Sequence, residues 1–589
     1  MFRATSYDVL GAAFVPVVFF SIWLAPHTSS ATNKPACIER MPEDRESDNG
    51  TLCEPEDPCP KEGMCDPGVS YVGSANYGRL SQINLENVGK LQVAWTLSGT
   101  EGGGGAIPLV IGDTMYVRSR FNTVAVNLRD QTVRWKYELK WGGDVAPMVC
   151  CETVSRSLAY GDGKIFLQSG NSLLALDAKA GKVVWEVPGE GGSPHVIAGK
   201  VLMYSPGHQG GDRGHLIAYD AQGGKRLWTA WDAGPDSDRR FDSRTMSWSN
   251  GLLAQAGGDF GARRDQVNQF EPIKGTIWGG YAYDGRLKVV YYSIGRPGSL
   301  VPGQARGDYG SSMAIFARDL DTGVAKWTFQ LAPHDAWDFG NTDDLLLINL
   351  LNQGKSIAAL VHFDRNGFAY SFDRETGALL RAERFDPAMQ WATVVDMKSG
   401  RPVFDRAYDS RTNTANVNGA AACADGFTSR EHHSASYDRR LGLVVFPTGH
   451  RAAATVATGE PTGDLIAWDP TAGNIAWSNH DRISACSSAL TTAGGLVFYV
   501  ALDGYLKAVG NNDGKEHWRF KISSAAAGSP FTYQYNGKQF LGLLSGTERS
   551  HGIARISGTG ESAPNSRMDP SRSSPNPLDG TLYVFSTSE

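Results

Sequence analysis

Short apolar runs bounded by glycine recur along the whole chain. Gly199–Tyr204 and Gly495–Val500 are two of them, and both are rich in Val, Leu, Phe or Tyr. Runs of this length and composition predict β-strands. Long stretches with the 3.6-residue periodicity of an amphipathic helix are not evident. The pattern therefore predicts an all-β protein.

A second pattern is superimposed on these strands: an apolar strand, then Asp, a turn with Gly, and Trp. Clear copies span 175–185, 218–228, 317–327 and 467–477, and weaker copies end at Trp95, Trp135, Arg381 and Trp518. The Asp and Gly predict a tight hairpin turn, and the Trp predicts a large ring buried against the next unit. A recurrence of roughly 40–50 residues is the length of one four-stranded blade. Eight copies predict an eight-bladed β-propeller with tryptophan-docking repeats.

The propeller is expected to occupy residues 75–589. Two stretches between repeats, near 231–275 and 385–430, are too long for ordinary blade connections. We expect these insertions to cap one mouth of the central channel.

The N-terminal residues differ from this pattern. Residues 1–31 contain Arg3, an apolar run from Val9 to Ala25 and then small residues, which predicts an export signal peptide. The apolar run leaves a retained membrane anchor as the alternative. We expect cleavage, a periplasmic protein and no stable membrane span.

Residues 32–74 form a cysteine-containing extension with Cys37, Cys53, Cys59 and Cys65. An even number of cysteines in an exported chain predicts disulfide bonds, whose pairing stays open. The motif Cys-x-x-Cys-His does not occur, so covalent c-type haem is not expected. Any electrons produced must leave through a separate partner.

Overall charge narrows the possible partners. The 589 residues carry a net charge of −6, and Lys and Arg form no long block. This balance argues against a nucleic-acid-binding protein.

Cys150 and Cys151 are the most specific clue to chemistry. Neighbouring Cα atoms lie about 3.8 Å apart, below the roughly 4.4–6.8 Å usual for a disulfide. A bond between these two cysteines would close a small strained ring. The alternative is a pair of free buried thiols.

Several motifs, in this order and spacing, resemble the PQQ-dependent (quinoprotein) alcohol dehydrogenases of the methanol/ethanol type. They are Cys150-Cys151 with Arg156, then 278–284, 333–339, 363–370, and 501–507 leading to 528–530. The resemblance covers nearly the whole chain from about residue 75. It implies the same propeller fold and an enzyme whose cofactor is PQQ.

The resemblance also implies where the cofactor lies. The flat quinone would lie between the Cys150–Cys151 disulfide and the indole of Trp278, while Arg156 and Thr276 would hold its carboxylates. A core tryptophan is the alternative for Trp278. Contact with an aromatic face suits an electron-poor planar ring.

Two further residues match the family's reactive positions. Asp338 would be the general base that takes the hydroxyl proton of the alcohol while a hydride leaves the carbinol carbon. Arg365 would point at the reactive carbonyl of the quinone and stabilise negative charge there. An ordinary strand-end arginine is the alternative for Arg365, and Asp335 and Trp337 are expected to be structural.

The metal site departs from the family. Such enzymes usually bind calcium through a glutamate, an asparagine and the catalytic aspartate. Of these only Asp338 is kept, because Gln209 and Arg296 stand at the other two positions. Either a nearby carboxylate such as Asp212 supplies the missing oxygens, or Arg296 itself provides the positive charge beside the quinone and the ion is weakly bound or absent. We expect retained Ca²⁺ with Asp338 and Gln209 as ligands. Gly340 stands two positions after Asp338, where the lanthanide-using members of the family have an extra aspartate, so calcium is favoured over a lanthanide.

Other departures from the family lie near the pocket, at Gly105, Glu431, His432 and Cys486. They reduce bulk at its mouth, so we expect an alcohol larger than methanol, such as a secondary alcohol or a polyol. Cys423 and Cys486 are left as a further candidate disulfide pair.

The predicted function is an exported PQQ-dependent alcohol dehydrogenase that passes electrons to a separate acceptor such as a soluble cytochrome c. Two alternatives stay open at this point. One is a non-catalytic envelope scaffold built on the same propeller. The other is oxidation of a sugar or an aldehyde at the same site.

Overall fold

The computed structural model describes part of the chain in detail. The described residues are 77–98, 107–119, 122–140, 158–189, 192–205, 214–232, 235–249, 252–255, 281–295, 313–333, 345–352, 355–387, 389, 391–405, 434–449, 463–481, 487–501, 503–522, 528–545 and 580–588. The chain divides into two compact units, Met1–Glu39 and Arg40–Glu589. The predicted signal peptide 1–31 and extension 32–74, with their four cysteines, lie outside the described residues. Everything below concerns the second unit.

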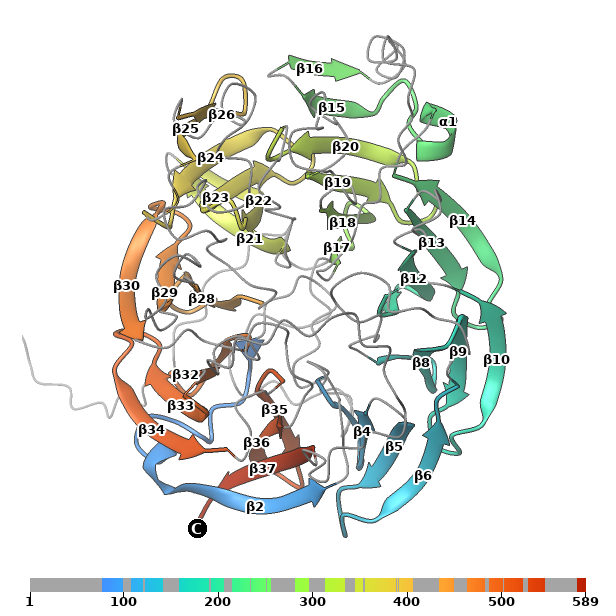
Figure 1. Cartoon of the computed structure of the whole chain (residues 1–589), viewed down its shortest axis with the longest axis vertical. Helices are drawn as coiled ribbons and strands as arrows, with labels where there is room; N and C mark the ends of the chain where they lie inside the picture. The colour runs from blue at the N-terminus through green and yellow to red at the C-terminus, as the bar shows by residue number, and fades with distance from the viewer. Residues whose placement is uncertain are drawn as a thin grey trace, which may run out of the picture. The chain divides into compact units, whose positions relative to one another are not determined.

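Eight antiparallel sheets form a ring in which each sheet is one blade (Figure 1). Strands of the first four blades are β3 (Leu109–Ile111), β4 (Thr114–Arg118), β5 (Asn122–Asn127) and β6 (Val133–Glu138); β7 (Ala159–Gly161), β8 (Lys164–Ser169), β9 (Ser172–Asp177) and β10 (Val183–Pro188); β11 (His195–Ile197), β12 (Lys200–Ser205), β13 (His215–Asp220) and β14 (Arg226–Trp231); and β17 (Ala282–Asp284), β18 (Val289–Ile294), β19 (Ala314–Asp319) and β20 (Ala325–Gln330).

The next three blades continue in the same order around the ring. Their strands are β21 (Leu345–Asn352), β22 (Lys355–Phe363), β23 (Phe368–Asp373) and β24 (Leu379–Arg384); β27 (Ser436–Asp438), β28 (Leu443–Pro447), β29 (Gly463–Asp469) and β30 (Asn474–Asp481); and β31 (Leu490–Thr492), β32 (Leu496–Ala501), β33 (Tyr505–Gly510) and β34 (Glu516–Lys521). The short β1 (Tyr77–Gly78) adds to the seventh blade by pairing in parallel with β31. The predicted all-β, eight-bladed propeller is thus confirmed.

The eighth blade closes the ring by joining the two ends of the propeller. It combines β35 (Phe531–Tyr535), β36 (Lys538–Ser545) and β37 (Thr581–Thr587) with β2 (Leu91–Ser98) from the start of the propeller. β2 pairs antiparallel with β37, from Leu91 opposite Thr587 to Ser98 opposite Thr581. A single turn of 3-10 helix, η2 (Val88–Lys90), precedes β2. Closure lets the apolar faces of the first and eighth blades pack against each other, which an incomplete ring would leave exposed.

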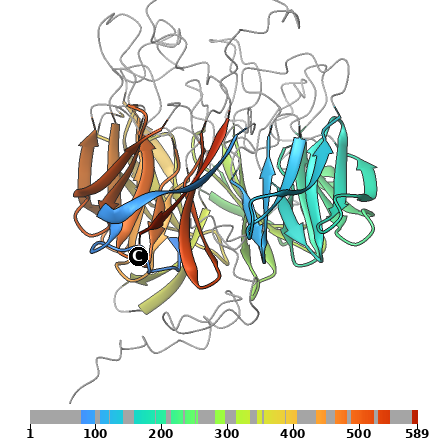
Figure 2. The same cartoon turned by 90° about the horizontal axis from the view of Figure 1, so that it is seen from below.

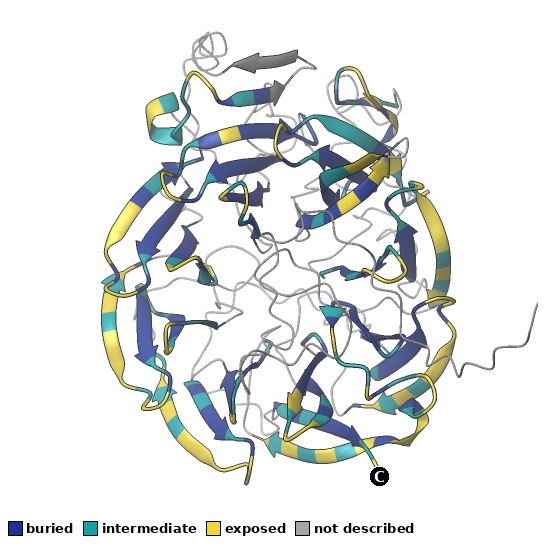
Figure 3. Ribbon diagram, turned by 180° about the vertical axis from the view of Figure 1, so that it is seen from behind, coloured by how far each residue is buried: buried dark blue, intermediate teal, exposed yellow. Residues whose placement is uncertain are grey.

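Burial follows the position of a strand within its blade (Figure 3). The second strand β4 is buried at all five positions, whereas the outer strand β6 alternates between exposed and partly buried residues. Apolar clusters fill the wedges between neighbouring blades, and one of them joins Tyr116 and Ala125 of the first blade to Leu167 and Leu174 of the second. This is why inner strands read as continuous apolar runs and outer strands alternate.

Tryptophan docking holds neighbouring blades together. The Nε1–H of Trp135 donates to the Ala178 carbonyl of the next blade at 2.9 Å, and Trp228 and Trp327 make the corresponding bonds to Leu320 and Arg374 at 3.0 and 3.1 Å. Each of the eight repeats identified in the sequence ends on the outer strand of one blade. The count of eight blades from these repeats is therefore confirmed blade by blade.

One blade uses a different side chain for the same contact. Arg381 takes the position of the tryptophan on β24, and its Nη1 donates to the Ala472 carbonyl of the next blade at 2.6 Å. Its guanidinium lies against Gly473, where five other blades place an indole ring against the turn glycine of the next blade. A planar guanidinium offers the flat face and the N–H donor that the contact requires.

The insertions do not cap the channel where they are described. In the first, α1 (Asp236–Arg239) and β15 (Met246–Ser249) with β16 (Leu252–Gln255) follow blade three, and β15 pairs in parallel with the outer strand β20. In the second, β25 (Ala392–Asp396) and β26 (Arg401–Phe404) form a hairpin. Arg384 of the outer strand β24 donates to the Ala392 carbonyl of that hairpin at 2.7 Å. Both described parts lie at the outer edge (Figure 1), so the expectation of a cap is wrong for them.

Candidate active site

The strand directions define two faces of the ring. Because each blade is an antiparallel meander, its second and fourth strands both end at one face, and its third strand ends at the other. We call the first the site face. Figure 2 shows the ring from the side, with the strands running between the two faces. The Asp-Gly turns of the docking repeats connect third to fourth strands, so these turns lie at the opposite face.

Every predicted site residue falls in a connection that begins and ends at the site face. Some connections join a fourth strand to the next blade and some join a second strand to a third. The first kind contains Cys150, Cys151, Arg156, Thr276, Trp278 and Asp338; the second kind contains Gln209, Arg296 and Arg365. Of these, only Arg365 is among the described residues. The docking turns and the connections that contain the predicted site residues thus begin at opposite faces of the ring.

Arg365 lies in the tight turn that joins β22 to β23 in the fifth blade. Its side chain is partly buried, whereas both neighbours, Asp364 and Asn366, are fully buried. The Asp364 carboxylate accepts from the Asn366 N–H at 2.9 Å, and Asn366 Oδ1 accepts from the Phe368 N–H at 3.0 Å. Side chains of this type fix such turns by bonding to nearby backbone. The turn therefore presents Arg365 from a rigid base.

Further buried groups support this turn from behind. His362 Nε2 lies 3.1 Å from Asp364 Oδ2, and neither side chain is exposed. Asn366 Nδ2 donates to the Tyr370 hydroxyl at 2.9 Å, and Trp391 Nε1 donates to the Asn366 carbonyl at 2.7 Å. Sequence reasoning identified the motif around Arg365 but missed His362 and Trp391. The Asp-x-Asn-Gly pattern was the available signal for the turn, and nothing in the sequence indicated the contact with Trp391.

Arg118 is a second basic group on the site face that sequence reasoning missed. It ends β4 of the first blade and is only 5% exposed. Its Nη2 donates to the Gln168 carbonyl of the second blade at 2.8 Å. Burial lowers the pKa of Arg118 to about 10, so the guanidinium stays charged at neutral pH. Basic groups on this face fit a cofactor that carries several carboxylates.

A buried carboxyl group lies at the base of two site-face connections. Asp232 directly follows β14 and is 1% exposed, and the Tyr204 hydroxyl donates to its Oδ2. The Asp232 N–H donates to the Gly214 carbonyl at 2.9 Å. Burial raises the pKa of Asp232 to about 7, against the lowering effects of Tyr204, Arg318 and Arg239. Asp232 stands at the start of the connection that contains Trp278, and Gly214 stands at the end of the connection that contains Gln209. The bond between Asp232 and Gly214 therefore links these two connections at their base.

Metal ligands cannot be assigned from the described residues. Within them, no group of three or more His, Cys, Asp or Glu side chains is placed to hold a metal ion. The predicted ligands Asp338 and Gln209 lie outside this part of the chain. Their role, like that of Cys150, Cys151, Arg156, Thr276 and Trp278, stays a prediction.

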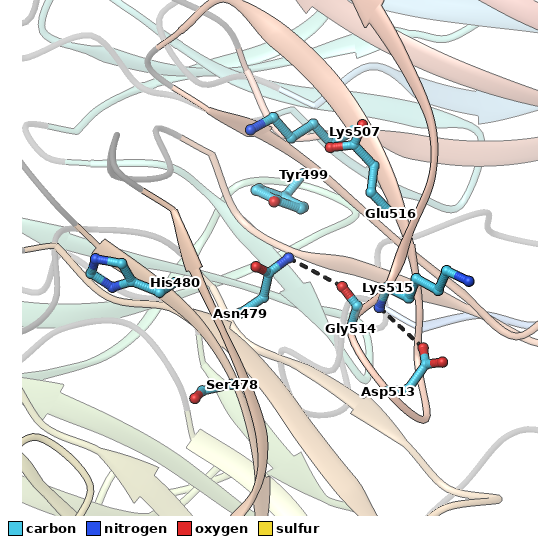
Figure 4. A pocket seen from close by; sticks show the side chains of 9 residues that line it. All are labelled: Ser478, Asn479, His480, Tyr499, Lys507, Asp513, Gly514, Lys515 and Glu516. Atoms are coloured by element: carbon cyan, nitrogen blue, oxygen red, sulfur yellow. Dashed lines mark hydrogen bonds between the residues drawn. The ribbon is translucent and has the colours of Figure 1, made fainter.

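A polar hollow of about 430 Å³ lies between the sixth and seventh blades (Figure 4). His480, Lys507 and Glu516 are among its lining residues, and Asn479 Nδ2 donates to the Gly514 carbonyl at 3.1 Å. Gly514 belongs to the turn between β33 and β34 at the face opposite to the site face. Arg365, the predicted site residue that the structure describes, is not among the lining residues. In the described part of the chain, no helix is long and apolar enough to cross a membrane.

Comparison with known proteins identifies the family. Residues 70–193, 189–386 and 479–541 match the family model "PQQ: Glucose/ethanol/alcohol dehydrogenase, beta-propeller domain". The chain is 38% identical to the lanthanide-dependent methanol dehydrogenase of Methylorubrum extorquens, over 88% of this chain and 93% of that protein. It is 33% identical to methanol dehydrogenase [cytochrome c] subunit 1 of the same organism, over 83% and 85%. The solved structure of a europium-containing methanol dehydrogenase superposes with a TM-score of 0.74 at 29% identity, covering 87% of this chain and 96% of that one.

The chain belongs to the family of PQQ-dependent alcohol dehydrogenases, and it is an enzyme of the quinoprotein alcohol dehydrogenase type. The resemblance inferred from the motifs is thereby confirmed. The alternative of a non-catalytic scaffold is excluded.

Proposed function

We propose that this protein is an exported quinoprotein that oxidises an alcohol larger than methanol, such as a secondary alcohol or a polyol, to the carbonyl compound. One observation carries the proposal beyond family membership. Nine residues predicted to form one site, from six different blade connections, all fall between strand ends of the same face. Positions scattered over both faces would have been incompatible with a single site.

The cofactor would be held by groups from two connections, the one between β6 and β7 and the one between β14 and β17. Cys150 and Cys151, as a vicinal disulfide, would contact one side of the flat ring system and Trp278 the other. Arg156 and Thr276 would bind its carboxylates. When bound, PQQ accepts a hydride from the substrate.

Two side chains of this chain would act in the reaction itself, one on the hydroxyl proton of the substrate and one on the negative charge that develops on the quinone. Asp338 takes the proton of the substrate hydroxyl, which requires a carboxylate within hydrogen-bond reach of that oxygen. Arg365 would stabilise negative charge that develops on the quinone, and a rigid turn suits this task because a preorganised donor needs no reorganisation. The buried Asp364 and Asn366 fix that turn.

The metal is proposed to be Ca²⁺, with Asp338 and Gln209 among its ligands. Relatives include a lanthanide-dependent enzyme. Gly340 stands where lanthanide-using members carry an additional aspartate, so this chain has one carboxylate fewer for a trivalent ion. Arg296, at an expected ligand position, cannot ligate a cation and lowers the positive charge the site tolerates.

Electrons leave through a separate acceptor. A relative is named methanol dehydrogenase [cytochrome c], which supports a soluble cytochrome c as the acceptor here. Residues 1–31 support export to the periplasm, where the cysteines of residues 32–74 would be oxidised.

The test is reconstitution of purified apo-protein with PQQ, with and without Ca²⁺ or La³⁺, followed by dye reduction over a panel of alcohols, aldehydes and sugars. The proposal expects PQQ-dependent turnover that is highest with Ca²⁺ and with a secondary alcohol or a polyol. Turnover without PQQ contradicts the cofactor. Higher turnover with La³⁺ contradicts the metal, and a preference for aldehydes or sugars contradicts the substrate class.

A further inference from the structure

Arg118 has a bonding pattern that is unusual for a buried charge. Its Nη2 bonds to the Gln168 carbonyl, but its Nε and Nη1 are sealed from solvent and have no hydrogen-bond partner among the described residues. Three N–H groups of the guanidinium therefore have no acceptor within the described part of the chain. No ion pair of the described part involves Arg118. A buried cation of this kind is unfavourable unless an anion or several acceptors compensate it.

Thr123 lies directly opposite Arg118 in the same blade and has the same deficiency. The two residues are register partners on β4 and β5, so their side chains lie on the same face of the sheet. Thr123 is not exposed, and its Oγ1 is buried without a hydrogen-bond partner among the described residues. Two buried polar groups with unused hydrogen-bonding capacity thus stand side by side.

The orientation of this pair follows from its neighbours along the strands. Tyr116 and Ala125, two positions away on the same sheet face, pack against the second blade. Arg118 and Thr123 therefore face the wedge between the first and second blades, at its site-face end. β4, β5 and β8 lie around this wedge in Figure 1.

The wedge also anchors the connection that contains the paired cysteines. Ser169, at the site-face end of β8, accepts from the Lys140 N–H at 2.7 Å and donates to the Lys140 carbonyl at 3.4 Å. Lys140 is the last described residue before the connection with Cys150, Cys151 and Arg156. Arg118 therefore lies at the base of the connection that is proposed to hold the cofactor.

We infer that Arg118 and Thr123 form a carboxylate-binding point for a ligand of the site face. The inference rests on the proposed function, since it places this point in the same active site. A guanidinium beside a hydroxyl is suited to a carboxylate, which accepts hydrogen bonds from both and neutralises the buried charge. The carboxylate comes either from the cofactor or from a substrate that is a hydroxy acid.

The test compares Arg118→Gln and Thr123→Val with the wild-type protein and with Arg129→Gln. Arg129 is an exposed arginine of the same blade at the opposite face, so its variant controls for general loss of charge. Three quantities are measured: the Tm of the apo-protein, the Kd of PQQ from quenching of tryptophan fluorescence, and KM for 4-hydroxybutanoate and for 1-butanol.

A cofactor carboxylate predicts that Arg118→Gln weakens PQQ binding about 10-fold or more, with a smaller loss in Thr123→Val and none in Arg129→Gln. A substrate carboxylate predicts unchanged PQQ binding and a KM about 10-fold higher for 4-hydroxybutanoate, with KM for 1-butanol unchanged. In both cases the apo-protein of Arg118→Gln melts no lower than wild type, because the uncompensated charge is gone.

Three results overturn the inference. The first is that neither the Kd of PQQ nor KM changes in Arg118→Gln. The second is that this variant loses stability without any change in ligand binding, which would mean that Arg118 is paired within the chain. The third is that the wild-type protein does not bind PQQ, which overturns the proposed function as well. The first two leave the proposed function intact.

Discussion

The indole of Trp327 lies directly over Gly377 of the next blade. Gly377 has a φ of +75°, and a Cβ at this position would lie 2.6 Å from the indole ring. The same indole donates from Nε1 to the Arg374 carbonyl at 3.1 Å. Glycine is thus required here for two reasons, the left-handed backbone conformation and the close approach of the ring.

These two requirements can be separated by mutation. Gly163 has nearly the same backbone conformation, φ +74°, but a Cβ there would meet nothing within 4 Å. We expect Gly163→Ala to cost about 1 kcal/mol from backbone strain, and Gly377→Ala to cost about 1–3 kcal/mol more because the indole must move. Thermal and urea unfolding of both variants measure the difference. Equal losses would show that the tryptophan contact does not require glycine.

The docking contacts also explain why the fold was predictable. Asp, Gly and Trp act within one hairpin and its immediate neighbour, so each copy leaves a local pattern in the sequence. The copy that ends at Arg381 was recognisable because it has Asp373 and Gly377 at the usual positions. The insertions were not predictable because their length says nothing about where they pack. β15 joins the outer strand β20 in parallel, a long-range contact that no local pattern encodes.

The candidate site was predictable only in outline. Its residues come from connections far apart in sequence, and the family resemblance, not their spacing, brought them together. Arg118, Thr123 and Asp232 escaped notice because their burial results from packing between blades. An arginine at the end of a strand reads as a surface residue until the neighbouring blade is known.

Asp232 predicts a pH dependence of stability. Burial raises the pKa of Asp232 to about 7 in the folded protein, from the ordinary value of 3.8 for an exposed carboxyl, so the folded state holds the proton more tightly. The resulting stabilisation is complete below pH 4 and is lost as pH rises through 7, by up to about 4 kcal/mol. Asp232→Asn stays neutral, so we expect its Tm to exceed that of wild type increasingly between pH 5 and pH 8.

The control for that series is Asp513→Asn, which removes an exposed carboxylate from the turn between β33 and β34, in another blade. It should follow the wild-type profile. A wild-type Tm that is parallel to that of Asp232→Asn over the whole range would show that Asp232 does not bind a proton in this window.

Arg365 is expected to act on turnover more than on cofactor binding. Replacing it by Gln should lower kcat about 100-fold or more, the usual effect of removing one preorganised donor to developing charge, with PQQ affinity changed only a few-fold. Arg519→Gln, on the outer strand β34 with a side chain 57% exposed, serves as the control. An unchanged kcat in Arg365→Gln would contradict a role in the reaction and would favour the alternative that Arg365 is an ordinary arginine at the end of a strand.

Substrate size provides an independent test of the pocket. Gly105, Glu431, His432 and Cys486 are expected to leave a wider mouth than in enzymes for methanol. We expect kcat/KM for a bulky secondary alcohol or a polyol to exceed that for methanol. Faster oxidation of methanol would contradict the proposed substrate class but not the cofactor.

The most direct test of the whole account is kcat of the PQQ-loaded Asp338→Asn variant, measured beside Asp335→Asn with equal cofactor content confirmed by absorbance. Asp338→Asn should retain PQQ and lose at least about 100-fold in kcat, because no carboxylate then takes the hydroxyl proton, while Asp335→Asn should stay within a few-fold of wild type. Undiminished turnover in Asp338→Asn, or an equal loss in both variants, would contradict the assignment of the general base and with it the proposed site.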